Sequence, residues 1–494
     1  MSIRRFPGFS SEFSRTRRLD IRRTVRAVAA ILLLAVCWCV LVSTQNGFLT
    51  ATPEALAAST GRPLSMNSSL PGSQVIQHVV IIFQENRSPD NLFQDPVLIQ
   101  RGADIQSYGI NSKQQKVPLQ PVPMADYWDL GHSHGSFVKM YDKGKMDGAN
   151  RIQQFCDPGY KCGKAPPNFQ FAYVQPQDAA PYFQLAEQYT FADRMFQTNQ
   201  GPSFPAHQFV LAGTSAPTAT STMFASEGPV GGSNRPGLHT GCTAPPGQRV
   251  EMIDPSGVEG QKMFPCFEHS TLSDLLDAQS LSWRFYTPVP NDLDTAPNAI
   301  RHLRFGPDWK KDIVEGPARI LSDVAQGRLA SVTWVIPSSQ ESDHPGTNDG
   351  LGPSWVASVV NAIGGSQFWS STAIFVSWDD WGGWYDHVAP VVVNDGTSWG
   401  SGYVYGFRVP LLVISPYAQQ AYISHVTHDF GSILKFTEEV FGLPSLGYAD
   451  AYADDLSDCF NFGQSPLAFR KIHAPYDGNF FLHDRRPLQA PDND

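Results

Sequence analysis

The chain has 494 residues, of which 41% are hydrophobic and 17% are charged, and its formal net charge is −10. This composition supports a large buried core and excludes an intrinsically disordered chain, which would carry more charge and fewer aromatic residues. The acidic balance, with no basic stripe in the body of the chain, argues against nucleic acid as a partner.

The N-terminal segment differs from the rest of the chain. An arginine-rich start precedes an uncharged apolar stretch from Ala27 to Val42, and Ala55-Leu56-Ala57 offers a small-residue cleavage site. We expect residues 1–57 to be a signal peptide or an N-terminal membrane anchor, and residues 58–73 to be a flexible linker. Residues 74–494 would then form one catalytic domain. In either case the body of the protein is exported to the periplasm or the extracellular space.

The cysteines fit an exported protein. Of the seven cysteines, Cys37 and Cys39 lie in the apolar N-terminal stretch. In the rest of the chain, Cys156 and Cys162 are close in sequence, as are Cys242 and Cys266, whereas Cys459 stands alone. Because disulfides form in oxidising compartments, we expect two local disulfides and one unpaired thiol.

A buried strand followed by polar residues opens the catalytic domain. His78 to Phe83 is an uncharged apolar run, typical of a strand buried on both faces of a parallel sheet. Glu85 and Asn86 follow at the strand end, where open α/β sheets bind ligands. Their oxygen atoms suit a hard divalent cation. The alternative is that both residues only solvate a turn.

The middle of the chain is less regular. A helical spacing of apolar residues follows Gly131, and residues 181–200 indicate a helix and a loop. Gly201 to His207 begins as a tight Gly/Pro turn that opens toward an apolar segment. Residues 216–265 lack periodicity, which predicts a long surface excursion, with a cap over the site as one role.

Regular alternation returns near Ser270. Strand and helix patterns succeed each other up to residue 445, which predicts an α/β fold with a mostly parallel central sheet, flanking helices and long loop insertions. The predicted helices are 271–279, 352–363 and 432–444, and the predicted strands are 281–287, 331–338, 372–380 and 408–418.

The predicted strand 372–380 ends in two acids, Asp379 and Asp380. If it lies beside the first strand, four oxygen-bearing side chains converge. Without a cation, such groups would repel one another and raise one another's pKa. We therefore predict one divalent metal ion of unknown identity. Its ligands would be Glu85, Asn86, Asp379 and Asp380.

Several blocks of the chain resemble those of a known family, in the same order. They read ENRSPDNLF, GHSHG with GKMDG, GPSFPAHQF, SDHPG, DDWGGWYDHV, RVPLLVISPYA and SHVTHDFGSILKFTEEVFGLP. Together they are similar to the phosphoesterase family of bacterial phospholipases C and acid phosphatases, within the alkaline phosphatase superfamily. A full set in order is far more specific than any single motif. The resemblance implies an alkaline-phosphatase-like fold and a metal-dependent hydrolase that cleaves phosphate esters.

The resemblance also implies roles for single residues. Ser203 stands at the hydroxyl position of the GPSFPAHQF block and would be the nucleophile, since a bound cation lowers the pKa of a serine that otherwise attacks phosphorus poorly. Histidines would serve the phosphoryl oxygens and the leaving group. The candidates are His132, His134, His344 and His302.

Departures from the family pattern leave the substrate class open. Pro89 and Asn91 replace the usual Phe and His, and Phe430-Gly431 replaces His-Thr. The paired aspartates are more similar to the acid phosphatase branch. The substrate is therefore expected to be either a phosphate monoester or a phospholipid, the latter with association at a membrane surface.

Two alternative functions follow from the sequence. The stretch Gly131 to Gly135 fits G-x-S-x-G, the nucleophile elbow of α/β-hydrolase-type serine esterases, with Asp379 and His425 later in the right order. The preceding residues, rich in prolines and acids, do not form the buried strand that this motif requires. The other alternative is a non-catalytic exported protein that holds a metal structurally.

Overall fold

The structure is a computed structural model, which describes residues 70–156, 161–231, 239–346, 348–392 and 404–491. The predicted signal peptide or anchor, and nearly all of the predicted linker, lie outside the described residues. Within the described ranges, no helix combines the length and the apolar character needed to cross a bilayer. All these ranges belong to one compact unit.

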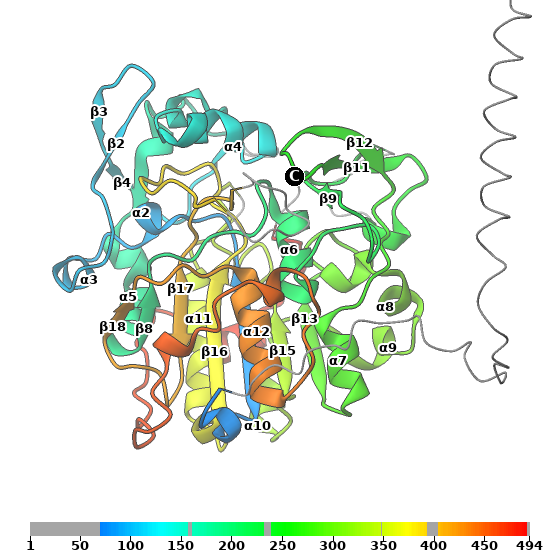
Figure 1. Cartoon of the computed structure of the whole chain (residues 1–494). Coiled ribbons are helices and arrows are strands. Elements are labelled where there is room, and N and C mark those ends of the chain that lie inside the picture. The colour runs from blue at the N-terminus through cyan, green and yellow to red at the C-terminus, as the bar shows by residue number, and fades with distance from the viewer. Residues whose placement is uncertain (1–69, 157–160, 232–238, 347, 393–403, 492–494) are drawn as a thin grey trace, which may run out of the picture. The chain divides into compact units, whose positions relative to one another are not determined.

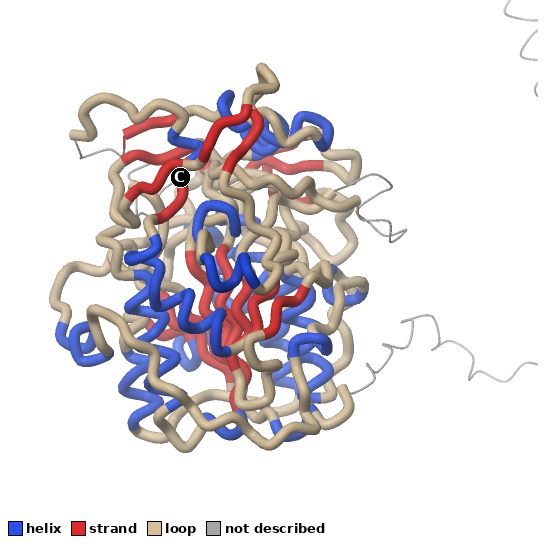
Figure 2. Tube along the Cα trace, turned by 90° about the vertical axis from the view of Figure 1, so that its left-hand side faces the viewer, coloured by secondary structure: helices blue, strands red, loops and turns tan. Residues whose placement is uncertain are grey.

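An eight-stranded sheet forms the centre of this unit, and it lies between two layers of helices (Figure 1, Figure 2). The strand order is β14-β13-β15-β1-β16-β17-β8-β18. In chain order the strands are β1 (His78–Gln84), β8 (Thr190–Ala192), β13 (Trp283–Thr287), β14 (Ile313–Glu315), β15 (Val332–Val335), β16 (Thr372–Trp378), β17 (Leu411–Ile414) and β18 (Tyr422–Ser424).

The predicted mostly parallel sheet is confirmed. Neighbouring strands run parallel, except that β17 is antiparallel to both β16 and β8. The described residues between β16 and β17 include no helix, and antiparallel neighbours need no helical crossover. Strands β8, β14 and β18 have three residues each, which is too short for a pattern of alternation to reveal them.

Helices cover both faces of the sheet. Phe375 of β16 contacts Phe436, whereas Trp378, three residues further along the same strand, contacts Tyr182 from the opposite face. Helices α5, α10 and α13 pack around α11, and α7 and α12 pack against α6. Their bounds are α5 (Pro176–Gln188), α6 (Ser203–Ala212), α7 (Leu272–Ala278), α10 (Arg319–Ala325), α11 (Gly352–Gly364), α12 (Phe430–Phe441) and α13 (Gly478–His483).

Local capping explains where the predicted helices begin and end. Thr271 caps α7 with a reciprocal capping box. Asp429 does the same for α12, and Gly442 ends that helix at a φ of 64°. Helix α6 was not predicted as such. Helix α6 begins at Ser203, directly after Pro202. The turn predicted at Gly201 to His207 therefore overlaps the first five residues of the helix.

Residues 216–265, predicted to be a long surface excursion, contain a small antiparallel sheet that the lack of periodicity did not reveal. It comprises β9 (Phe224–Ala225), β10 (Val230–Gly231), β11 (Gln248–Ile253) and β12 (Glu259–Met263). Both predicted disulfides are present, Cys156–Cys162 and Cys242–Cys266, and Cys459 is free and buried. The second disulfide closes a loop that contains β11 and β12.

Candidate active site

The four proposed ligands follow the ends of two neighbouring strands. Strand β1 pairs in parallel with β16, and the register holds to the last residue of each strand. The residues that follow are therefore level with each other, and the backbone N–H of Asn86 donates to Oδ1 of Asp379 at 2.9 Å. Glu85, Asn86, Asp379 and Asp380 are all fully buried. The predicted adjacency of the two strands is thus confirmed, whereas the role of these residues as metal ligands stays a prediction.

The turn after β16 is shaped to fit against Asn86. Asn86 has a left-handed backbone, with a φ of 56°. Gly382, with a φ of 62°, approaches so closely that an added Cβ would lie 2.6 Å from both the Cβ and the carbonyl oxygen of Asn86. The N–H of Gly382 donates to Oδ1 of Asp380 at 2.6 Å. A glycine is therefore required here both by the backbone conformation and by the space.

Buried polar atoms at this point fit a cation. Both side-chain polar atoms of Asn86, and Oδ2 of Asp379, have no hydrogen-bond partner among the described residues. Such atoms are rare in proteins, because leaving one unsatisfied costs about 1–3 kcal/mol. Amide and carboxylate oxygens are the ligands that hard divalent cations prefer. The donor set and its unsatisfied atoms therefore fit a divalent metal ion.

Ser203 lies beside this group. It is the first residue of α6 and is fully buried, and its hydroxyl donates to Oδ2 of Asp380 at 3.4 Å. The N-terminus of a helix favours negative charge, because its first N–H groups lack partners within the helix. This position suits a hydroxyl that must ionise and an anionic group that would approach it.

Sequence reasoning missed two further residues of the site. His207 lies one turn after Ser203 on α6, so both side chains point the same way. Its Nε2 is 3.5 Å from Oε1 of Glu85 and 3.6 Å from Oδ1 of Asp294, and all three side chains are buried. The spacing of Ser203 and His207 was a usable signal for a helix. Nothing in the sequence marked Asp294, which lies in a loop after β13.

Three of the four predicted histidines lie around the same region. The rings of His132 and His344 are 5.9 Å apart, and His132 also contacts Trp381, the residue after Asp380. Nδ1 of His132 interacts with the carbonyl of Leu130 at 2.9 Å, which orients the ring. His134 is held by the carbonyl of Gln200 at 3.1 Å, three residues before Ser203.

The loop that carries His344 is tied to the end of β1. The side-chain amide of Gln84 donates to the carbonyl of Glu341 at 3.0 Å, and its oxygen accepts from the N–H of Asp343 at the same distance. Arg87 donates to the carbonyl of Asp343 through two nitrogens, at 3.0 and 2.6 Å. Burial raises the pKa of Asp343 to about 6. Strand β1 thus positions both the proposed ligands and the proposed catalytic loop.

A cavity of about 350 Å³ opens next to the helix start. It is lined by His132, Pro202, Glu227 and Glu251, among others. Glu227 comes from the 216–265 segment and accepts from the N–H of His134 at 3.0 Å. Burial, reinforced by repulsion from Glu259, raises the pKa of Glu227 to about 7. The segment therefore supplies one wall of this cavity, and sequence reasoning did not identify Glu227.

His302 is not part of this group. It lies on α8 (Arg301–Phe305), where its ring is one-third exposed and bonds Glu268 at 2.6 Å and Asp274 at 3.0 Å. These two carboxylates, Asp274 foremost, raise the pKa of His302 to about 9. These ion pairs account for both ring nitrogens of His302 without a catalytic role, and its inclusion in the site stays a prediction.

The residues proposed for a serine esterase do not assemble. Ser133 caps α4 (His134–Tyr141) by accepting from the N–H of Ser136. A strand, β5 (Trp128–Leu130), does precede the motif, but it pairs only with β6 (Gln154–Cys156), outside the central sheet. His425 is half exposed and pairs with Asp193 at 2.9 Å.

Comparisons with known proteins match most of the chain. A model of the Phosphoesterase family matches residues 76–444. Phospholipase C A of Mycobacterium tuberculosis is 24% identical over 447 residues, which cover 80% of this chain and 79% of that protein. The non-hemolytic phospholipase C of Pseudomonas aeruginosa is 25% identical over 443 residues, which cover 78% of this chain and 57% of that protein.

Among solved structures, a protein in the alkaline phosphatase superfamily from Vibrio parahaemolyticus is similar at a TM-score of 0.33 and 12% identity. The match covers 76% of this chain and 70% of that one.

Proposed function

The chain belongs to the Phosphoesterase family and is a phosphoester hydrolase, and on this premise we propose that Ser203 is its nucleophile. The observation that carries the proposal is the position of the Ser203 hydroxyl, 3.4 Å from Asp380 and at the start of α6. We further propose that one divalent cation binds beside it. The ligands would be Glu85, Asn86, Asp379 and Asp380.

The cation would lower the pKa of the Ser203 hydroxyl and neutralise charge on the phosphoryl oxygens. Ser203 would attack phosphorus, the ester oxygen would leave with a proton, and water would hydrolyse the resulting phosphoserine. His207, which lies between the carboxylates of Glu85 and Asp294, would fix the orientation of Glu85.

The histidines would act on the substrate rather than on the cation. The rings of His132 and His344 meet from two different loops, His132 contacts Trp381 beside Asp380, and both histidines would donate hydrogen bonds to phosphoryl oxygens. His134 is a second donor candidate, although Gln200 already holds one of its nitrogens. No role is proposed for His302.

The substrate is proposed to be a phospholipid or a phosphate monoester. Relatives named phospholipase C favour the phospholipid, whereas the paired aspartates favour the monoester. Export through the N-terminal segment, and association with a membrane surface, remain part of this proposal.

The test compares Ser203→Ala with Ser133→Ala, using an aryl phosphate and phosphatidylcholine as substrates. Ser203→Ala is expected to abolish release of product while bound metal, measured by elemental analysis, stays unchanged. Ser133→Ala should lose about 1 kcal/mol of stability as a lost helix cap but remain active. A serine esterase would give the reverse result on a carboxylic ester. A non-catalytic metal protein would hydrolyse neither phosphate substrate.

Chelation provides a second arm. Removal of the cation from the wild-type protein should abolish hydrolysis, and Asp380→Asn should weaken metal binding. Full activity after exhaustive chelation would refute the metal-dependent mechanism while leaving the family assignment intact.

A further inference from the structure

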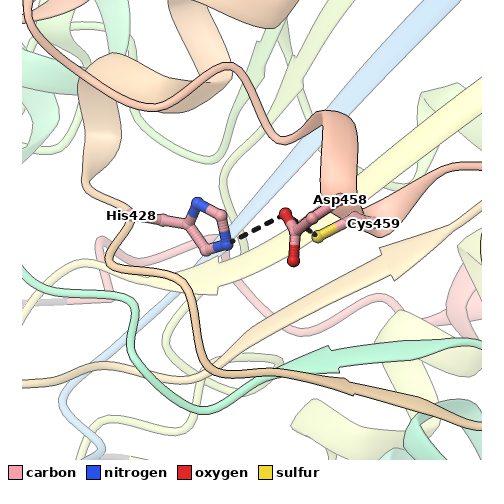
Figure 3. A group of neighbouring side chains, drawn as sticks. All are labelled: His428, Asp458 and Cys459. Carbon is pink, nitrogen blue, oxygen red and sulfur yellow. Dashed lines mark hydrogen bonds and ion pairs between the residues drawn. The ribbon is translucent and has the colours of Figure 1, made fainter.

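A second group of potential ligands lies away from Ser203, near the start of α12. His428 precedes that helix by two residues, and Asp458 and Cys459 belong to η9 (Ser457–Cys459). Figure 3 shows the three side chains pointing toward one another from these two segments. One ligand atom from each, a ring nitrogen, a carboxylate oxygen and a sulfur, lies within 4.8 Å of the others.

The distances match those between ligands of one tetrahedral ion. Nε2 of His428 is 3.6 Å from Oδ1 of Asp458, and Sγ of Cys459 is 3.5 Å from the same oxygen. Two bonds of ~2.0–2.3 Å at a tetrahedral angle place their ligand atoms about 3.5 Å apart. Both distances therefore agree with shared ligation of one ion, and the third pair of atoms lies within 4.8 Å.

The surroundings of His428 orient its ring for such a role. Nδ1 of His428 is 3.0 Å from Oδ1 of Asp454, so a carboxylate lies beside this nitrogen while Nε2 faces Asp458. A carboxylate on the far nitrogen of a histidine is the usual support of a metal-binding imidazole. Ser424 lies 3.2 Å from Nε2 and donates to Oδ2 of Asp458 at 2.5 Å, which fixes the carboxylate.

Burial divides the group into an inner and an outer side. His428 and Cys459 are fully buried, whereas the side chains of Asp454 and Asp458 are 32% and 23% exposed. An ion could therefore enter past the aspartates. Asp454 also borders a cavity of about 750 Å³ together with Thr427 and Ser457.

We propose that His428, Asp458 and Cys459 bind a zinc-type cation, with Asp454 as the support of His428. A set of nitrogen, oxygen and sulfur ligands selects zinc and similar borderline-soft metals over magnesium or calcium. The ion would join the start of α12 to the C-terminal segment and leave one coordination position for water.

The competing explanation is a set of ion pairs without a metal. A protonated His428 between Asp454 and Asp458 would satisfy the three charged groups, but it assigns no role to the sulfur of Cys459. The presence of a metal–sulfur bond therefore separates the two explanations. The oxygen ligands proposed near Ser203 cannot produce such a bond, so the two metal sites are distinguishable in one protein.

The experiment loads the full-length, metal-stripped protein with Co²⁺ and records its absorption spectrum. A thiolate-to-cobalt charge-transfer band in the near ultraviolet is expected, at one equivalent per chain. The band should disappear in Cys459→Ser and weaken at least tenfold in apparent affinity in His428→Gln, while Asp380→Asn should leave it in place.

Phosphate release by zinc-loaded Cys459→Ser should remain within about twofold of wild type, since a structural site lies outside the catalytic group. A cobalt complex of the wild type without the band would overturn the proposal, and this result needs no variant to fold. All proteins in this experiment also carry serine at Cys37 and Cys39, the two cysteines of the N-terminal segment. Survival of the band in Cys459→Ser on this background would overturn the proposal equally.

Discussion

Replacement of Gly382 by alanine tests whether the turn after β16 positions Asn86. The left-handed backbone at Gly382 makes any side chain there cost about 1 kcal/mol. The new Cβ would also lie 2.6 Å from the Cβ and the carbonyl oxygen of Asn86. Neither atom can move aside as the end of a long side chain can. Overpacking of this kind costs about 1–3 kcal/mol. The total expected loss of unfolding free energy is therefore about 2–4 kcal/mol.

The matched control is Gly442→Ala. Gly442 has nearly the same φ, 64° against 62°, and an added Cβ would meet no atom within 4 Å. This variant should lose only the conformational part, about 1 kcal/mol, measured by urea denaturation. Phosphate release should fall by about 100-fold in Gly382→Ala, since a shift of about 1 Å in a proposed ligand has that effect, and stay near wild type in Gly442→Ala. Equal stability and equal activity of the two variants would refute the reasoning.

Three further changes test other parts of the fold. Serine at both Cys242 and Cys266 should lower the unfolding free energy by about 3 kcal/mol, because a disulfide across a separation of 24 residues restricts the unfolded chain. An unchanged urea midpoint would contradict this prediction. Arg408→Met should cost about 3–5 kcal/mol, because buried Asp386, which accepts from Arg408 at 2.9 and 3.0 Å, would lose its partner; a loss below about 1 kcal/mol would show that Asp386 is neutral or solvated. The folded pKa of His302, about 9, lies above its unfolded value of 6.5. Its stabilising contribution should therefore be complete below pH 6.5 and disappear as the pH rises through 9. The difference in urea midpoint between wild type and His302→Gln should be present at pH 6 and absent at pH 10.

The strands that carry the candidate site were predictable because each one is a continuous apolar run that ends abruptly in polar residues. The strand β1 and its partner β16 match the predicted runs closely. Their adjacency was a hypothesis, and the parallel register confirms it. The starts of α7 and α12 also follow from local sequence, since Thr271 and Asp429 each form a capping box with the residue three positions later.

Other parts of the site depend on contacts between distant segments. Asp294 approaches His207 from a loop with no regular pattern, and Glu227 enters from a segment that seemed structureless in sequence. Strand β17 has the composition of a parallel core strand but runs the other way, because composition does not encode direction. The ion pairs of His302 with Glu268 and Asp274 were likewise hidden from the sequence, because those carboxylates lie 34 and 28 residues before it in the chain.

The cavity at the start of α6 and the proposed ligands come from different parts of the fold. Glu227 and Glu251 belong to the 216–265 segment and its small antiparallel sheet, while the proposed ligands hang from β1 and β16. Insertions or substitutions in the 216–265 segment would therefore change the cavity that could receive the alcohol group of the substrate. They would leave in place the strands that carry the proposed ligands. Proteins that share this fold could therefore differ in the substrates they accept and still keep the same proposed ligands.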